Sequence, residues 1–204
     1  IMKAEIRELQ LVDEDDTGIY AISIVDMPAI ESNFIALNKK GKTQYSLAKL
    51  DEEKKLLVGA ALIPNKQIAR LDAEENLYYV YFSKDTVKQA AYRFLKSSAH
   101  HNHTLQHQKE IEGLYVAESW IVESENDKSR QYGLNVPVGT WMVAVKVEND
   151  EIWEKEVKSG NVKGFSIEAY FSEKMKTKEV ESEDEFASLR DVVDSIAKQV
   201  SQID

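Results

Sequence analysis

Cysteine is absent from this 204-residue sequence, which excludes disulfides, cysteine nucleophiles and zinc sites built from thiolates. Positive charge is in the minority, since 26 Lys and Arg stand against 36 Asp and Glu and give a net charge of −10. This balance argues against nucleic acid as the main partner, because phosphate binding requires clustered Lys and Arg. No apolar run approaches the roughly 18 residues of a membrane span. No apolar signal region opens the sequence. We therefore expect a soluble intracellular protein without a membrane partner.

Apolar alternation and short apolar runs are frequent, and they predict about eight strands. The clearest strands cover residues 4–12, 18–25, 54–63, 77–82, 140–147 and 162–171, with a hairpin over 104–122. The run over 54–63 is almost continuously apolar, which is typical of a strand buried on both faces. A single apolar stripe predicts a helix over 84–97, with Ser83 as its N-cap. The fold class is thus mainly β with helices, α+β.

The C-terminal part differs in composition. Residues 172–184 are highly charged without apolar periodicity, and we interpret them as a linker after a domain over residues 1–171. Apolar residues then recur at spacings of three and four over 185–204, which predicts an amphipathic helix. Such a helix could dock on the domain or pair with another chain.

Ser166 interrupts an otherwise apolar predicted strand, and Gly164 two residues earlier permits close backbone approach. A serine in such a position is most often a structural residue. A histidine cluster elsewhere in the chain nevertheless makes it a candidate nucleophile. The segment Gly164–Glu168 is not the nucleophile elbow of α/β-hydrolases, because Glu168 stands where the second glycine should be.

The histidine cluster comprises His100, His101, His103 and His107. We expect the first three to lie in a solvated loop and His107 to lie inside the predicted hairpin. If Glu112-Gly113 forms the hairpin loop, Glu118 lies directly across from His107 and could orient its imidazole. A one-residue slip would separate the pair.

Two alternatives remain open for this cluster. Glu168 is the alternative to Glu118 as the residue that orients the imidazole. Residues two apart on a strand share a face, so Glu168 would lie on the same face as Ser166. His101, His103 and His107 would also share a face of an extended strand and could bind a metal. No zinc-type His-Glu-x-x-His spacing accompanies them, so a metal-dependent hydrolase is the weaker hypothesis.

Five segments together resemble the phage prohead (capsid maturation) serine proteases of the XkdF-like group. They are Ala21–Ile30, Thr104–His107, Val116–Val122, Val138–Val143 and Val162–Glu168, in this order along the chain. The resemblance spans about residues 18–171. It implies a β-barrel flanked by helices, like the herpesvirus assembly protease.

The resemblance also implies Ser166 as the nucleophile and His107 as the general base. The extra histidines beside His107 depart from the family pattern, and they make His103 the second candidate base. The resemblance does not settle the third residue, for which the hairpin geometry favours Glu118 over Glu168. The implied activity is cleavage of scaffold and capsid proteins, and of the protease itself, inside the assembling procapsid in the host cytoplasm. No cofactor is implied, and we expect a homo-oligomer. The competing class is a catalytically silent capsid-assembly or scaffolding protein with the same fold.

Overall fold

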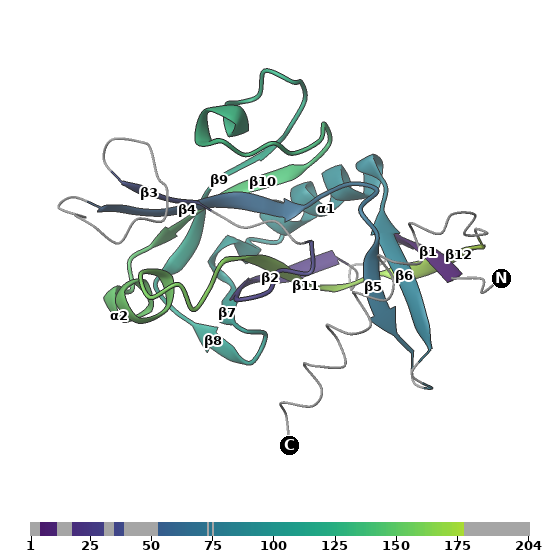
Figure 1. The fold of residues 1–204 in the computed structure, drawn as a ribbon, viewed down its shortest axis with the longest axis horizontal. Helices are drawn as coiled ribbons and strands as arrows, with labels where there is room; N and C mark the ends of the chain where they lie inside the picture. Colours follow the sequence, from purple (N-terminus) through teal and green to yellow (C-terminus); the bar gives the residue numbers. More distant parts are fainter. Residues whose placement is uncertain are drawn as a thin grey trace. The chain divides into compact units, whose positions relative to one another are not determined.

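The computed structural model describes residues 5–11, 18–30, 35–38, 53–72, 74 and 76–177. The strands in these ranges are β1 (Glu5–Gln10), β2 (Gly18–Val25), β3 (Ile35–Asn38), β4 (Glu53–Leu62), β5 (Ile68–Leu71), β6 (Leu77–Phe82), β7 (His103–Leu105), β8 (Lys109–Ile111), β9 (Leu114–Ile121), β10 (Trp141–Val147), β11 (Gly164–Tyr170) and β12 (Ser172–Thr177). They form three four-stranded sheets in the orders β12-β1-β6-β5, β3-β4-β10-β9 and β11-β2-β7-β8 (Figure 1). The mainly β prediction is confirmed.

Helices are few among the described residues. They are α1 (Lys84–Lys96), the 3₁₀ turns η1 (Ala99–His101) and η2 (Lys128–Tyr132), and α2 (Asp150–Ile152), which continues as the π-helical η3 (Trp153–Val157). Ser83 caps α1 as predicted, because its side chain accepts a hydrogen bond from the Thr86 amide. None of the described helices has the length and apolar character needed to cross a bilayer.

The chain divides into two compact units. The smaller is built around β1, β5, β6 and β12, and within it the buried Glu8 carboxylate accepts a hydrogen bond from the Tyr81 hydroxyl at 3.3 Å. The larger contains the other two sheets and α1. The candidate residues all lie in the larger unit. The domain boundary expected at residue 171 stays a prediction.

The core of the larger unit forms where the sequence is most apolar. In β10 the residues Trp141 to Val145 are at most 1% exposed, and β10 is flanked by β4 on one side and β9 on the other. β4 is equally buried over Leu57–Leu62, as its continuous apolar run predicts. Helix α1 adds Phe94, whose ring meets Trp141 edge-on at 5.4 Å between centroids. β4 also packs against β11 and α1 against β2, so this core supports the third sheet.

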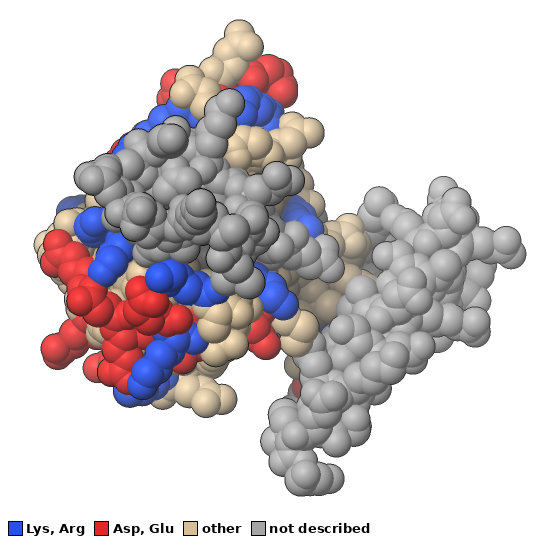
Figure 2. Space-filling view, turned by 60° about the vertical axis from the view of Figure 1, so that its left-hand side comes forward, with Lys and Arg blue, Asp and Glu red and all other residues tan. Residues whose placement is uncertain are grey.

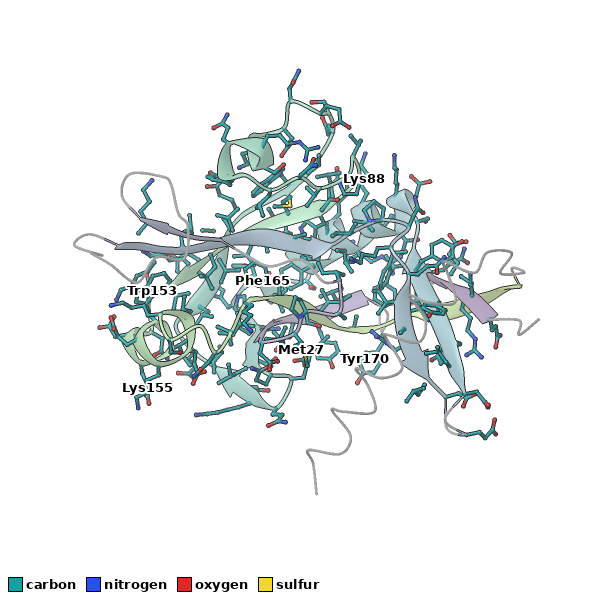
Figure 3. All side chains as sticks on the ribbon, viewed as in Figure 1. Met27, Lys88, Trp153, Lys155, Phe165 and Tyr170 are labelled. Carbon is teal, nitrogen blue, oxygen red and sulfur yellow. The ribbon has the colours of Figure 1, made fainter. Side chains whose placement is uncertain are left out.

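The third sheet, β11-β2-β7-β8, carries the candidate residues. β2 lies at its centre, antiparallel to β11 and parallel to β7. Phe165 of β11 is fully buried and lies on the β4 side, whereas Tyr170 lies on the opposite side (Figure 3). Since side chains alternate along a strand, Ser166 and Glu168 are directed away from Phe165.

One expectation about the β structure is not confirmed and another is wrong. The described strands form three four-stranded sheets, with no closed barrel among them. The hairpin is shorter than predicted, because β7 pairs with β8 in the register His103↔Ile111, while β9 joins the sheet of β10. Gly113 marks the change of sheet, with a φ of +79° and a position so close to Asn149 that a Cβ would lie 3.1 Å from that side chain. Glu112-Gly113 is therefore a turn between sheets and not a hairpin loop.

The predicted C-terminal segments lie partly outside the described residues. Ser172–Thr177, the first part of the expected linker, forms β12 and neighbours β1. Residues 178–204, which include the predicted amphipathic helix over 185–204, lie outside the described ranges. The herpesvirus-like fold and the terminal helix stay predictions.

Charged side chains of both signs share the surface. On the face shown in Figure 2, acidic side chains gather beside lysines and arginines. On α2 and η3 the same arrangement gives two ion pairs, Glu151–Lys155 at 2.8 Å and Glu154–Lys158 at 3.0 Å. Exposed pairs of this kind add little to stability, so the fold depends mainly on its apolar core.

Candidate active site

Ser166 lies in the interior of β11, directly opposite Ser23 of β2. The preceding Phe165 is fully buried, while Ser166 itself is partly exposed. Within the described part of the chain, its hydroxyl has no hydrogen-bond partner and is not bonded to His107. Catalytic hydrogen bonds are often long in an unliganded protein and shorten when substrate binds. The position thus suits a nucleophile that is accessible but held by a rigid strand.

His107 lies in the tight turn that joins β7 to β8. The Gln108 amide donates to the Leu105 carbonyl at 3.0 Å, and the two corner residues, Gln106 and His107, have φ values of +53° and +58°. These values define a type I′ turn, which normally contains Asn and Gly. Left-handed conformations of other residues cost about 1–3 kcal/mol each and are concentrated at functional sites.

The turn is fixed to β2 through its first corner residue. The Gln106 amide donates to the Ile24 carbonyl at 3.0 Å, and the Gln106 side-chain oxygen accepts from the Asp26 amide at 3.2 Å. Together these bonds extend the β2–β7 pairing past the end of β7. The turn therefore presents the His107 side chain, which is 42% exposed, beside the face that carries Ser166.

Glu168 is the carboxylate next to His107. Its Oε1 lies 3.3 Å from His107 Nδ1 and also accepts a hydrogen bond from the Thr104 hydroxyl. The Glu168 side chain is only 16% exposed, so the contact is protected from solvent on one side. With the proton on Nδ1, the imidazole donates to Glu168 and leaves Nε2 free to accept a proton.

Glu118 lies elsewhere. It is on β9 opposite Ala144, and its carboxylate forms an ion pair with Lys128, whose ammonium group also lies 3.8 Å from the centre of the Trp120 ring. The predicted pairing of His107 with Glu118 is wrong, because the two residues belong to different sheets. Of the two candidate acids, the structure brings Glu168 to His107.

His103 is buried, contrary to the expected solvated loop. It is 2% exposed, and its ring nitrogens lie 3.1 Å from the Ile22 carbonyl and 3.3 Å from the His100 carbonyl. Burial lowers the pKa of His103 to about 4, against the opposing effect of the two carbonyls. A neutral ring held between two backbone oxygens cannot reach a substrate, which disfavours His103 as the base.

The other two histidines do not complete a metal site. His100 and His101 lie side by side with ring centroids 4.3 Å apart. In the parts of the chain that are described, no three His, Asp or Glu side chains are grouped so as to hold a metal ion. The shared face expected for His101, His103 and His107 is not formed, because η1 and the type I′ turn interrupt the extended chain.

Three residues near the site escaped the sequence analysis. Thr104 binds Glu168, and Ser23 lies between Ser166 and the turn. Tyr20 stacks on Tyr170 at 5.3 Å, and both are exposed at the end of the same sheet. The pKa of Tyr20 is raised, first by partial desolvation and then by the nearby Glu168 carboxylate. Thr104 belongs to the Thr104–His107 segment of the resemblance, but nothing in the sequence marked its hydroxyl as a partner of Glu168.

The arrangement has the parts of a charge-assisted nucleophilic site. A carboxylate fixes one imidazole nitrogen, the other nitrogen is available to remove a proton, and a serine lies on the same face of the same sheet. This combination suits acyl transfer.

Comparison with protein families gives one result. The family described as "Putative phage serine protease XkdF" matches residues 44–175, nearly two-thirds of the chain. No curated protein and no solved structure matches the chain. The matched range includes His107, Thr104 and the whole of β11 with Ser166 and Glu168. This chain belongs to the XkdF family of phage serine proteases.

Proposed function

We propose that the chain is a serine endopeptidase that cleaves scaffold and capsid proteins during procapsid maturation in the host cell. Ser166 is the nucleophile, His107 the general base and Glu168 the residue that orients the imidazole. The observation that carries this assignment is the 3.3 Å contact between His107 Nδ1 and Glu168 Oε1 on the face that bears Ser166. Glu168 replaces Glu118 as the preferred third residue.

The reaction follows from this geometry. His107 Nε2 removes the Ser166 proton as Oγ attacks the peptide carbonyl, and Glu168 stabilises the imidazolium that forms. The imidazolium then donates its proton to the amine nitrogen, and the C–N bond breaks. The amine departs, and the acyl group stays bound to Ser166 Oγ as an acyl-enzyme. Water, activated by the same nitrogen, releases the acyl group. Proton transfer of this kind contributes roughly 10²–10⁴-fold to the rate.

The distance from His107 to Ser166 is limited by the residue between them. Ser166 is directly opposite Ser23, which places their Cβ atoms about 4.5–5.5 Å apart. The His107 amide lies 3.0 Å from the Ser23 hydroxyl. The His107 backbone is thus about one strand spacing from Ser166, on the side where Ser23 lies.

A fluorophosphonate probe tests the nucleophile directly. We expect it to label wild-type protein at Ser166, as located by peptide mass mapping, and to label neither Ser166→Ala nor His107→Ala. Ser129→Ala is the control, because Ser129 is fully buried in η2 and therefore out of reach of the probe. Labelling of Ser166→Ala at wild-type level would contradict the assignment.

Turnover is followed by intact mass with scaffold protein added. Wild type should cleave scaffold or itself, and Ser166→Ala should do neither. Self-cleavage is expected in the charged segment over 172–184, where Ser172–Thr177 would first have to leave β12. If neither form produces fragments and the probe does not react, the chain is a catalytically silent assembly protein. The expected self-association is measured in the same samples by light scattering.

A further inference from the structure

Ser23 is a hydroxyl residue at the centre of the site sheet. It lies on β2 between Ser166 of β11 and Thr104 of β7, and it is fully buried. Its neighbours along the strand, Ile22 and Ile24, are also fully buried. Burial of a hydroxyl is unfavourable unless its hydrogen bonds are made. The partners of Ser23 therefore show what the residue does.

Both hydrogen-bonding functions of Ser23 are occupied. The hydroxyl donates to the Thr104 carbonyl at 3.2 Å and accepts from the His107 amide at 3.0 Å. The bond to Thr104 occupies its proton, and burial keeps substrate away from it. Ser23 is thus unsuited to be a second nucleophile, although it lies directly opposite Ser166.

The bond to His107 meets a specific need of the turn. In the Leu105–Gln108 turn the internal hydrogen bond uses the Gln108 amide, so the amide of His107 requires an acceptor from outside. The Ser23 hydroxyl is that acceptor. The two Gln106 hydrogen bonds hold the first corner of the turn. The Ser23 hydrogen bond instead holds the second corner, His107, which is the proposed general base.

We infer that Ser23 is a positioning residue that holds the His107 backbone in its left-handed conformation. A φ of +58° is unfavourable for histidine, and the turn relaxes when its anchor is removed. Relaxation moves the imidazole away from Glu168, whose other bond to Thr104 keeps the carboxylate in place. This inference rests on the proposed function for its catalytic consequence, but the hold on the turn is independent of activity.

Amide hydrogen exchange tests the hold on the turn in the wild-type protein. We expect the His107 amide to exchange slowly, although its side chain is 42% exposed, and to become unprotected in Ser23→Ala. The amide of Gln106, bonded to Ile24, should keep most of its protection. A His107 amide that exchanges freely in wild type would overturn the inference, whatever the protein's activity.

Kinetics test the catalytic consequence. We expect Ser23→Ala to lower kcat about 10²-fold with little change in KM, since displacement of a reacting group by about 1 Å has effects of that size. Thr140→Val is the matched control, because Thr140 is also fully buried and its hydroxyl donates to a backbone carbonyl, that of Pro137, at 2.7 Å. Thr140→Val should lose similar stability and keep its kcat.

The outcomes separate this inference from the proposed function. If His107→Ala retains full turnover, the proposed base is wrong, and the exchange result alone then decides whether Ser23 holds the turn. If His107→Ala is inactive and Ser23→Ala is folded with wild-type kcat, the positioning role is wrong. Should Ser23→Ala fail to fold, Ser23→Cys keeps the side-chain volume with a weaker acceptor and should give an intermediate kcat.

Discussion

Glu168 on β11 and Glu118 on β9 are chemically identical residues in two different regions of the larger unit, and their surroundings differ. Glu168 is 16% exposed and receives hydrogen bonds from Thr104 and His107. Glu118 is 49% exposed, and its partner is Lys128 in the η2 segment. A half-exposed ion pair of the second kind contributes at most about 1 kcal/mol. The comparison shows that the sheet to which a carboxylate belongs, and not its distance from His107 along the chain, determines whether it can serve the site.

The two regions also differ in how their residues are held. In the site region, backbone and side-chain hydrogen bonds link β11, β2 and the turn after β7. In the β9 region, Lys128 contacts both Glu118 and the Trp120 ring, and Trp120 donates to Asp127 at 3.1 Å. The second set fixes a surface loop against its strand. The first set fixes one imidazole.

The largest difference expected between the regions is in catalysis. Glu168→Gln keeps the size of the side chain but replaces the acceptor that orients His107, and we expect kcat to fall about 10³-fold or more, as for the orienting acid of serine proteases. Glu118→Gln is the matched control on β9 and should remain within about twofold of wild type, since only an exposed ion pair is lost. Steady-state kinetics on a cleavable scaffold peptide measure both.

The reverse result would indicate that Glu118, and not Glu168, orients the His107 imidazole. A large loss in Glu118→Gln with wild-type activity in Glu168→Gln would mean that the site forms only after a rearrangement of the sheets. Loss in both variants would require circular dichroism and thermal unfolding to separate misfolding from catalysis.

Local patterns of the sequence were sufficient for much of the fold. The apolar run of β4, the stripe of α1 with its Ser83 cap, and the strand around Ser166 were all predicted because burial and capping depend on neighbours along the chain. Ser166 and His107 were selected as candidates by the same means, together with the family resemblance. Their positions in the larger unit are compatible with those roles.

The pairing of His107 depended on contacts that the sequence does not encode locally. Glu112-Gly113 has the composition of a hairpin loop, yet it connects two sheets, and nothing in the two residues distinguishes these cases. The true turn contains Gln106 and His107, neither of which is a typical type I′ residue. The parallel pairing of β7 with β2 joins segments about 80 residues apart, which no short-range pattern could indicate.

Acid should weaken the site region through His103, the buried histidine of β7. Its pKa is lowered from 6.5 to about 4 by burial, so the folded protein keeps the ring neutral while the unfolded chain binds a proton. Stability is therefore complete above about pH 6.5, falls as the pH drops towards 4, and loses about 3 kcal/mol in total through this group. Denaturant unfolding at a series of pH values measures the loss.

The variant His103→Gln isolates this contribution from the carboxylates that titrate in the same range. It should be less stable at pH 7, because the packing between Ile22 and His100 is altered, but its stability should fall less steeply below pH 6.5. Hydrogen exchange should show β7 opening before β9 as the pH falls. Equal slopes for wild type and variant would mean that His103 is not held neutral.

The smallest effect concerns the second hydrogen bond to Glu168. Thr104→Val preserves the shape of a buried side chain and removes the hydroxyl that donates to the carboxylate. We expect kcat to fall about tenfold, because a hydrogen bond to a charged group contributes about 1.5–3 kcal/mol and only part of it acts on the orientation of His107. The Ser23 bond should persist, since it uses the backbone carbonyl of residue 104. Slow exchange of the His107 amide in Thr104→Val would therefore show that the carboxylate and the turn are held separately, whereas loss of that protection would show that they act as one unit.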